Sequence, residues 1–119
     1  MELKETVKYL SALNGTSGDE NDVTKAIIAL LPKDVKYKID PLGNLIVEKQ
    51  GKARPKSKLM IDAHTDEVGF IVTNINGDGT LSFDAVGGIL PYVVFGRQVK
   101  FKNGVHGAIA GVPLHLLKG

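Results

Sequence analysis

The chain has 119 residues, of which 43% are apolar, and its 15 lysines and arginines exceed its 13 acidic residues by only two charges. This composition is typical of one soluble domain, and so small a net charge argues against a nucleic-acid or membrane partner. Because the sequence has no cysteine, disulfides, thiolate ligands and a cysteine nucleophile are excluded, and any metal must be held by histidine, aspartate or glutamate. No apolar stretch approaches the roughly 18 residues that span a bilayer, and the amino terminus does not resemble a signal peptide, so we expect a cytoplasmic location.

Two amphipathic helices are expected at the beginning of the chain. Apolar residues at three- and four-residue spacing predict a first helix over residues 3–13. Ser17 is followed three residues later by Glu20, which is the spacing of a capping box, so we expect this pair to begin a second helix that ends at Pro32.

Strand signals follow the second helix. Alternating residues 35–40 and 45–47 flank turn-forming residues 41–44 and predict a hairpin at the edge of a sheet. Residues 49–58 contain five basic and no acidic side chains, with glycine and proline, and predict an exposed loop. The nearly continuous apolar run 59–63 is typical of a central strand buried on both faces.

The sequence changes character near residue 70. From there on, short β-like stretches, including Tyr92 to Phe95, alternate with glycine-containing turns and predict a small β-barrel or sandwich. We therefore expect an α/β protein with two regions, residues 1–69 and residues 70–119, neither of which is long enough to be a comfortable independent domain.

The strongest chemical signal is the sequence Asp62-Ala63-His64-Thr65-Asp66-Glu67, at the carboxyl end of the expected central strand. Because alternate side chains share one face of a strand, His64 and Asp66 can point together to the edge where open α/β sheets bind ligands. A metal-bound imidazole usually donates its second N–H to a carboxylate, so this pair fits a metal ligand and its orienting partner. The same short pattern also fits an ordinary polar turn in which the histidine binds nothing.

Other catalytic signatures are missing. The sequence has no His-Glu-x-x-His zinc helix, no Gly-x-Ser-x-Gly nucleophile turn and no glycine-rich phosphate loop. His106 and His115 have no acidic neighbour in the sequence, so we expect them to be structural or surface residues.

Four sequence blocks, taken in order, carry a family resemblance; they are residues 14–20, 40–45, 63–72 and 86–89. Together they resemble the amino-terminal part of the glutamyl, or deblocking, aminopeptidases, a dinuclear-metal family that includes the tetrahedral TET peptidases and some members with older labels as endoglucanases. The resemblance covers essentially the whole chain. It implies the amino-terminal portion of an αβα metallopeptidase domain over residues 1–69, followed by part of a small β-barrel-like insertion used for dimerisation over residues 70–119.

The resemblance also implies roles for individual residues. His64 would bind one of two divalent metal ions, zinc or cobalt. Asp66 would be the catalytic residue that orients the His64 imidazole. The resemblance gives no clear role to Glu67. The family's bridging aspartate, general-base glutamate and remaining ligands follow the insertion, in which this sequence ends, so we expect a fragment that is inactive alone. The implied partners are a peptide substrate and either further copies of the chain, as a homo-oligomer, or the missing carboxy-terminal segment. The alternative is a non-catalytic assembly or peptide-binding module derived from the same family.

Overall fold

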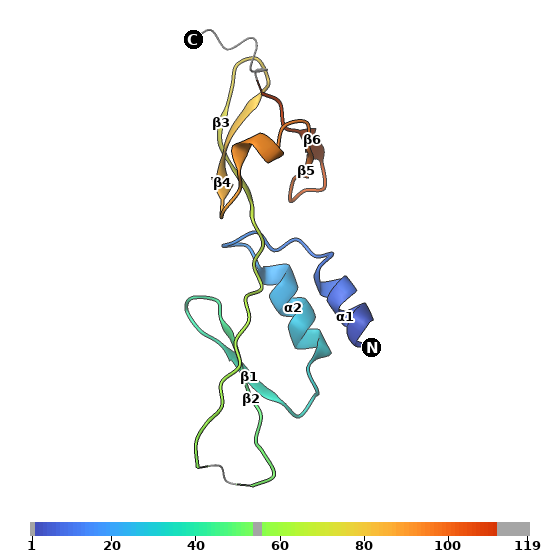
Figure 1. The fold of residues 1–119 in the computed structure, drawn as a ribbon, viewed down its shortest axis with the longest axis vertical. Coiled ribbons are helices and arrows are strands. Elements are labelled where there is room, and N and C mark those ends of the chain that lie inside the picture. Colours follow the sequence, from blue (N-terminus) through green and yellow to red (C-terminus); the bar gives the residue numbers. More distant parts are fainter. Residues whose placement is uncertain (1, 54–55, 112–119) are drawn as a thin grey trace. The chain divides into compact units, whose positions relative to one another are not determined.

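The computed structural model describes residues 2–53 and 56–111, and the chain divides into two units, Met1–Glu67 and Val68–Gly119. Figure 1 gives the order of the elements along the chain. In the described residues, no helix is both long enough and apolar enough to cross a membrane.

The first unit has two short helices, and the second of them provides its buried apolar side chains among the described residues. Helix α1 spans Leu3–Leu10 and helix α2 spans Asn21–Leu30, and the two contact each other. Val23 and Ala26 lie three residues apart, on the same face of α2, and each is only 6% exposed. The amphipathic pattern thus predicted both helices correctly, although α1 ends at Leu10 and residues 11–13 form turns.

The start of α2 shows that the predicted capping box is wrong. The residue preceding the helix is Glu20, and it makes no side-chain cap hydrogen bond. Its carboxylate instead accepts a hydrogen bond from the backbone N–H of Gly18 at 2.7 Å. Because Gly18 adopts a left-handed φ of 90°, the chain turns between Ser17 and Glu20, and Ser17 lies outside the capping position. The spacing of the pair therefore predicts a nearby helix but not its first residue.

The predicted hairpin is confirmed. Strand β1, Lys36–Ile39, pairs antiparallel with strand β2, Leu45–Glu48. The carboxylate of Asp40 closes the turn, because it accepts hydrogen bonds from the backbone N–H groups of Leu42 and Asn44 and from the side-chain amide of Asn44, at 2.9–3.0 Å. The side-chain hydrogen bond from Asn44 is the largest of the effects that lower the pKa of Asp40 below its ordinary value.

The predicted central strand does not form. Residues 59–63 are extended but belong to no strand, and the side chains of Leu59, Met60 and Ile61 are 87%, 83% and 86% exposed. A strand needs neighbours that satisfy its backbone N–H and C=O groups, and no strand in the described part of the chain pairs with this segment. The described residues of the basic segment 49–58 form neither helix nor strand, as predicted.

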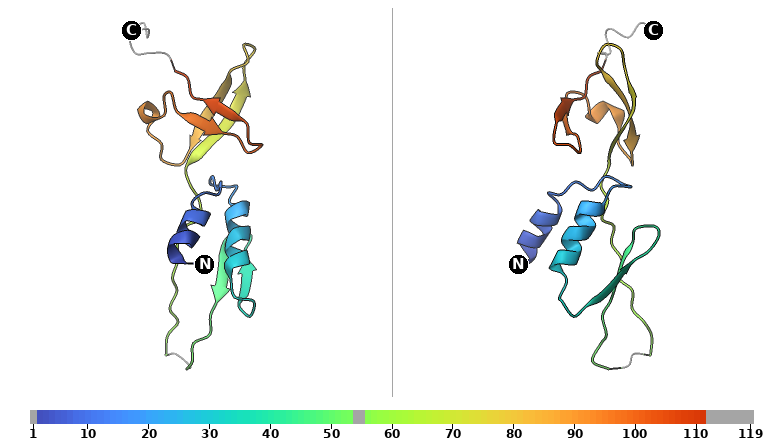
Figure 2. Two further views of the ribbon diagram at one scale, coloured as in Figure 1. Left: turned by 90° about the vertical axis from the view of Figure 1, so that its right-hand side faces the viewer. Right: turned by 180° about the vertical axis from the view of Figure 1, so that it is seen from behind.

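The second unit is rich in β structure, as predicted (Figure 2). Strand β3, Gly69–Ile75, pairs with β4, Leu81–Val86, and a bulge interrupts the register between Val72 and Asn74. Strand β5, Gln98–Lys100, pairs with β6, His106–Ala108. These hairpins remain separate two-stranded sheets in the described residues, so the expected barrel is not closed there.

One expected strand of this unit is wrong. Tyr92 to Phe95 was expected to be extended, but the short 3₁₀ helix η1 spans Pro91–Val93 instead. Proline favours the first position of a helix, because its φ is already helical and the N–H it lacks would be unpaired there. Pro91 therefore converts a β-like run into a helical turn.

Gly87 connects β4 to the segment that follows it. It has a left-handed φ of 88°, and a Cβ atom at this position would lie 2.9 Å from Cγ1 of Val68. Both the backbone conformation and the close approach of Val68 therefore require glycine here.

Candidate functional site

Two segments of the first unit that are distant in the sequence are paired beside His64. The backbone N–H of Glu67 donates to the carbonyl of Gly15 at 2.7 Å, and the N–H of Ser17 donates to the carbonyl of Glu67 at 3.2 Å. Thr16 and Glu67 thus form an isolated parallel bridge. The Glu67 side chain adds a third bond, because its Oε1 accepts from the N–H of Gly15 at 3.1 Å. Glu67, to which the sequence assigned no role, therefore holds the 15–17 turn in place.

Gly15 allows the turn to lie close to its neighbours. The residue is buried, and a Cβ atom there would lie 2.8 Å from Cγ2 of Val23 and 3.2 Å from the carbonyl oxygen of Thr65. Glycine is needed at this position because a side chain has no room.

The pairing brings the predicted His64 and Asp66 together with Ser17. Nδ1 of His64 lies 2.9 Å from Oδ1 of Asp66, and the Ser17 hydroxyl donates to Oδ2 of the same carboxylate at 2.5 Å. Both carboxylate oxygens are therefore engaged. The hydrogen bond from Ser17, followed by that from His64, lowers the pKa of Asp66, so the group is an anion at neutral pH.

This arrangement determines the tautomer of a neutral His64 ring. Nδ1 faces Oδ1 of Asp66 at 2.9 Å and the Asp66 carbonyl oxygen at 3.0 Å, and both of these oxygens can only accept hydrogen bonds. Nδ1 therefore carries the proton, and Nε2 keeps its lone pair. The His64 side chain is 86% exposed, whereas that of Asp66 is 40% exposed, so the lone pair is available to a ligand from solution.

An imidazole held in this way is suited to binding a metal ion through Nε2. A catalytic zinc ion needs about three protein ligands. Within residues 2–53 and 56–111, no group of three or more histidines and carboxylates could hold a metal ion. The described residues therefore offer one imidazole with an orienting carboxylate, and they do not complete a metal site.

Ser17 is the site residue that the sequence analysis missed. It was assigned to a helix cap, although the apolar stripe of α2 begins only at Val23, six residues later. That distance, and the presence of Ser17 in the first of the four family-like blocks, are the signals that could have identified it. His106 lies on β6 and is exposed, as expected of a surface residue, and His115 lies outside the described residues.

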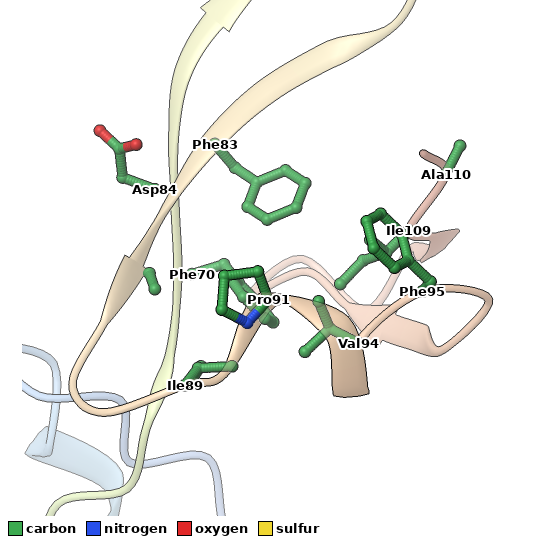
Figure 3. Close-up of a pocket in the computed structure, with 10 residues that line it drawn as sticks. Phe70, Phe83, Asp84, Ile89, Pro91, Val94, Phe95, Ile109 and Ala110 are labelled. Atoms are coloured by element: carbon green, nitrogen blue, oxygen red, sulfur yellow. The ribbon is translucent and has the colours of Figure 1, made fainter. Parts of the chain in front are cut away.

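The second unit contains an apolar groove of about 280 Å³ (Figure 3). Phe70 and Phe83, whose ring centroids are 5.0 Å apart at an interplanar angle of 75°, line it together with Pro91, Val94 and Ile109. The carboxylate of Asp84 points away from the ring of Phe83. The groove therefore offers mainly apolar contacts.

Known proteins resemble this chain in sequence and in structure. Residues 43–119 match the family described as M42 glutamyl aminopeptidase. The glutamyl aminopeptidase of Lactococcus lactis is 35% identical over 124 residues, a similarity that covers 100% of this chain and 35% of that protein. The TET1 peptidase of Pyrococcus horikoshii is 34% identical, with a TM-score of 0.78 over 98% of this chain and 35% of the other. A Thermotoga maritima protein named endoglucanase is 42% identical, with a TM-score of 0.75 over 89% of this chain and 34% of the other.

These similarities confirm the resemblance drawn from the four sequence blocks and the predicted α/β fold class. The chain spans about a third of the length of the curated relatives it matches.

Proposed function

This chain belongs to the M42 glutamyl aminopeptidase family, and from that membership we propose that it forms the amino-terminal part of a metal-dependent aminopeptidase in which His64 is a metal ligand. Its substrates would be peptides, from which the complete enzyme removes the amino-terminal residue. The metal ions would be two divalent cations, zinc or cobalt. Residues 1–69 would belong to the catalytic domain and residues 70–119 to the insertion.

The observation that carries the proposal is the hydrogen bond between His64 and Asp66. Because Asp66 accepts a hydrogen bond from Nδ1–H, the lone pair lies on the exposed Nε2, and an anionic carboxylate also makes the imidazole a stronger electron donor. When bound, the ions of a two-metal site polarise the scissile carbonyl and lower the pKa of a bound water. The part of this chain in that chemistry is to supply one oriented nitrogen ligand.

The remaining parts of the function rest on the relatives. The TET1 peptidase of Pyrococcus horikoshii can assemble into a tetrahedron or a large octahedral shell, and by analogy we propose that the complete protein forms a homo-oligomer. The cytoplasmic location stays a prediction from the sequence.

The test is to supply the part of the relatives' length that this chain does not cover. The chain would be fused in frame to the downstream part of the Lactococcus lactis glutamyl aminopeptidase, and release of the amino-terminal residue from a chromogenic peptide would be measured with zinc, with cobalt and with a chelator. We expect metal-dependent activity that His64→Ala abolishes. His106→Ala is the matched control, because it removes an exposed imidazole from β6, and it should retain activity.

The opposite outcome has a definite meaning. A fusion that folds and binds metal but releases no amino acid would favour the non-catalytic assembly or peptide-binding module. Activity that survives His64→Ala would show that the metal ligand is another residue.

A further inference from the structure

We propose that Ser17 is a positioning residue for the metal site: its hydroxyl fixes the Asp66 carboxylate, which in turn fixes the tautomer and orientation of the His64 ring. This inference rests on the proposed function for its purpose, but its physical content concerns only the side chains of this chain. It assigns to Ser17 a role that neither the motif spacing nor the family resemblance gave.

The Asp66 carboxylate is held at both of its oxygens. With His64 as its one partner, a carboxylate that is 40% exposed could rotate about its terminal torsion and exchange its two oxygens. The bond from Ser17 engages Oδ2 at 2.5 Å while Oδ1 faces Nδ1 of His64 at 2.9 Å. One carboxylate held at both oxygens has a defined plane, and that plane sets the direction of the bond to the imidazole.

Ser17 is itself held in place by its backbone. Its backbone N–H donates to the Glu67 carbonyl, and Glu67 is bonded to Gly15 through both its N–H and its side chain. The backbone bonds and the Glu67 carboxylate already connect the two segments. The Ser17 hydroxyl is therefore not required for the connection.

Ser17 does not cap helix α2, which is the conventional role of a serine before a helix. A serine before a helix usually accepts a hydrogen bond from a backbone N–H of the first turn. In this chain Glu20 precedes α2, and no side-chain cap is formed. The Ser17 hydroxyl instead donates across 49 residues of sequence to the carboxylate beside the proposed ligand.

The experiment measures the tautomer directly. The full chain, with ¹⁵N in its histidine rings, is studied by long-range ¹H–¹⁵N correlation spectroscopy without metal at mildly alkaline pH. In the unmodified chain His64 should show well-separated ring nitrogens, with Nδ1 protonated. In Ser17→Ala the two signals should move toward each other as the second tautomer gains population, although the Asp66 carbonyl oxygen still accepts from Nδ1. Ser17→Thr, which keeps the hydroxyl, should restore the separation.

Two internal references accompany the variants. Ser11→Ala removes a hydroxyl that donates to the Val7 carbonyl at 2.8 Å, so it is the same substitution in the same unit, and it should leave the His64 signals unchanged. The ring signals of His106 should not respond to any of the three variants.

The proposal is overturned if Ser17→Ala retains the separated His64 signals while the amides of Gly15 and Glu67 stay at their folded positions. If Ser17→Ala unfolds the 15–17 turn, Ser17→Thr decides the question, since converged His64 signals in a folded threonine variant also overturn the proposal.

A zinc titration of the same samples separates this inference from the proposed function. Zinc should shift Nε2 of His64, and Ser17→Ala should weaken that binding by about 10-fold, the lower end of the effect of losing an outer hydrogen-bond partner of a ligand. If zinc leaves Nε2 unmoved while Ser17→Ala still mixes the tautomers, the positioning role stands and His64 does not bind zinc in this chain alone. If zinc shifts Nε2 equally in both proteins and the tautomer is unaffected, the ligand stands and the positioning role fails.

Discussion

Replacing Gly15 by alanine should destabilise the first unit, and the structure gives the size of the effect. The new Cβ would lie 2.8 Å from Cγ2 of Val23 and 3.2 Å from the backbone oxygen of Thr65. Val23 is only 6% exposed, so its methyl group has little room to move, and a backbone oxygen has no rotamer to change. Such overpacking typically costs about 1–3 kcal/mol.

An opposing effect must be subtracted. The φ of Gly15 is not in the left-handed region, so alanine would also restrict the unfolded chain, which stabilises a protein by about 0.4–1 kcal/mol where the site is compatible. The net expectation is a loss of about 1.3 kcal/mol from the midpoints of the two ranges, within limits of about 0–2.6 kcal/mol.

The assay is urea unfolding of the full chain, with amide exchange at residue 15 as a local probe. Gly51→Ala is the matched control, because its nearest atom is the Ala53 carbonyl at an ordinary 3.7 Å, and it should be neutral or slightly stabilising. If Gly15→Ala is as stable as Gly51→Ala and keeps its amide protected, the close approach of the turn to α2 is not a constraint and the reasoning is refuted.

Three further outcomes are expected. Gly87→Ala should destabilise the second unit more than Gly104→Ala in urea unfolding, because both glycines have a left-handed φ but only the former would also clash, and equal losses would contradict this. The hydrogen bonds that lower the pKa of Asp40 stabilise the β1–β2 hairpin at pH values above the ordinary pKa of 3.8, and this stabilisation is lost as the pH falls through the lowered pKa. Cα chemical shifts of the hairpin should report the loss. A hairpin that is unchanged at acid pH would contradict the role of the bond from Asn44. The exposed apolar segment 59–61 should make the chain self-associate as its concentration rises in light scattering, and Ile61→Lys should reduce this, whereas a monomer at high concentration would contradict it.

The sequence predicts those elements of the fold whose causes are local. The 40–44 turn is one example, because its aspartate, glycine and asparagine bond to one another within five residues. Residues 59–63 are the opposite case, since a strand depends on partners that residue type alone does not supply. Pro91 lies between these two cases: its cause is local, because proline favours a helical turn, but the β-like residues that follow it predict a strand.

The candidate site divides in the same way. His64 and Asp66 are two residues apart, so a local rule placed their side chains together before the structure did. Ser17 and Glu67 take part through contacts that cross about 50 residues of sequence. No spacing rule can detect such a contact, and the local capping pattern at Ser17 predicted a different and incorrect partner.

Because Gly15 has no side chain, the 15–17 turn lies close to Val23 on α2 and also close to the segment that carries His64. The 15–17 turn rests on Val23 on one side and holds Glu67 and Asp66 on the other. We therefore expect a small translation of α2, or a change of side-chain volume at position 23, to move the 15–17 turn and with it the direction in which His64 points. A substitution on this helix can therefore alter the orientation of the His64 imidazole while every residue that hydrogen-bonds to it stays the same.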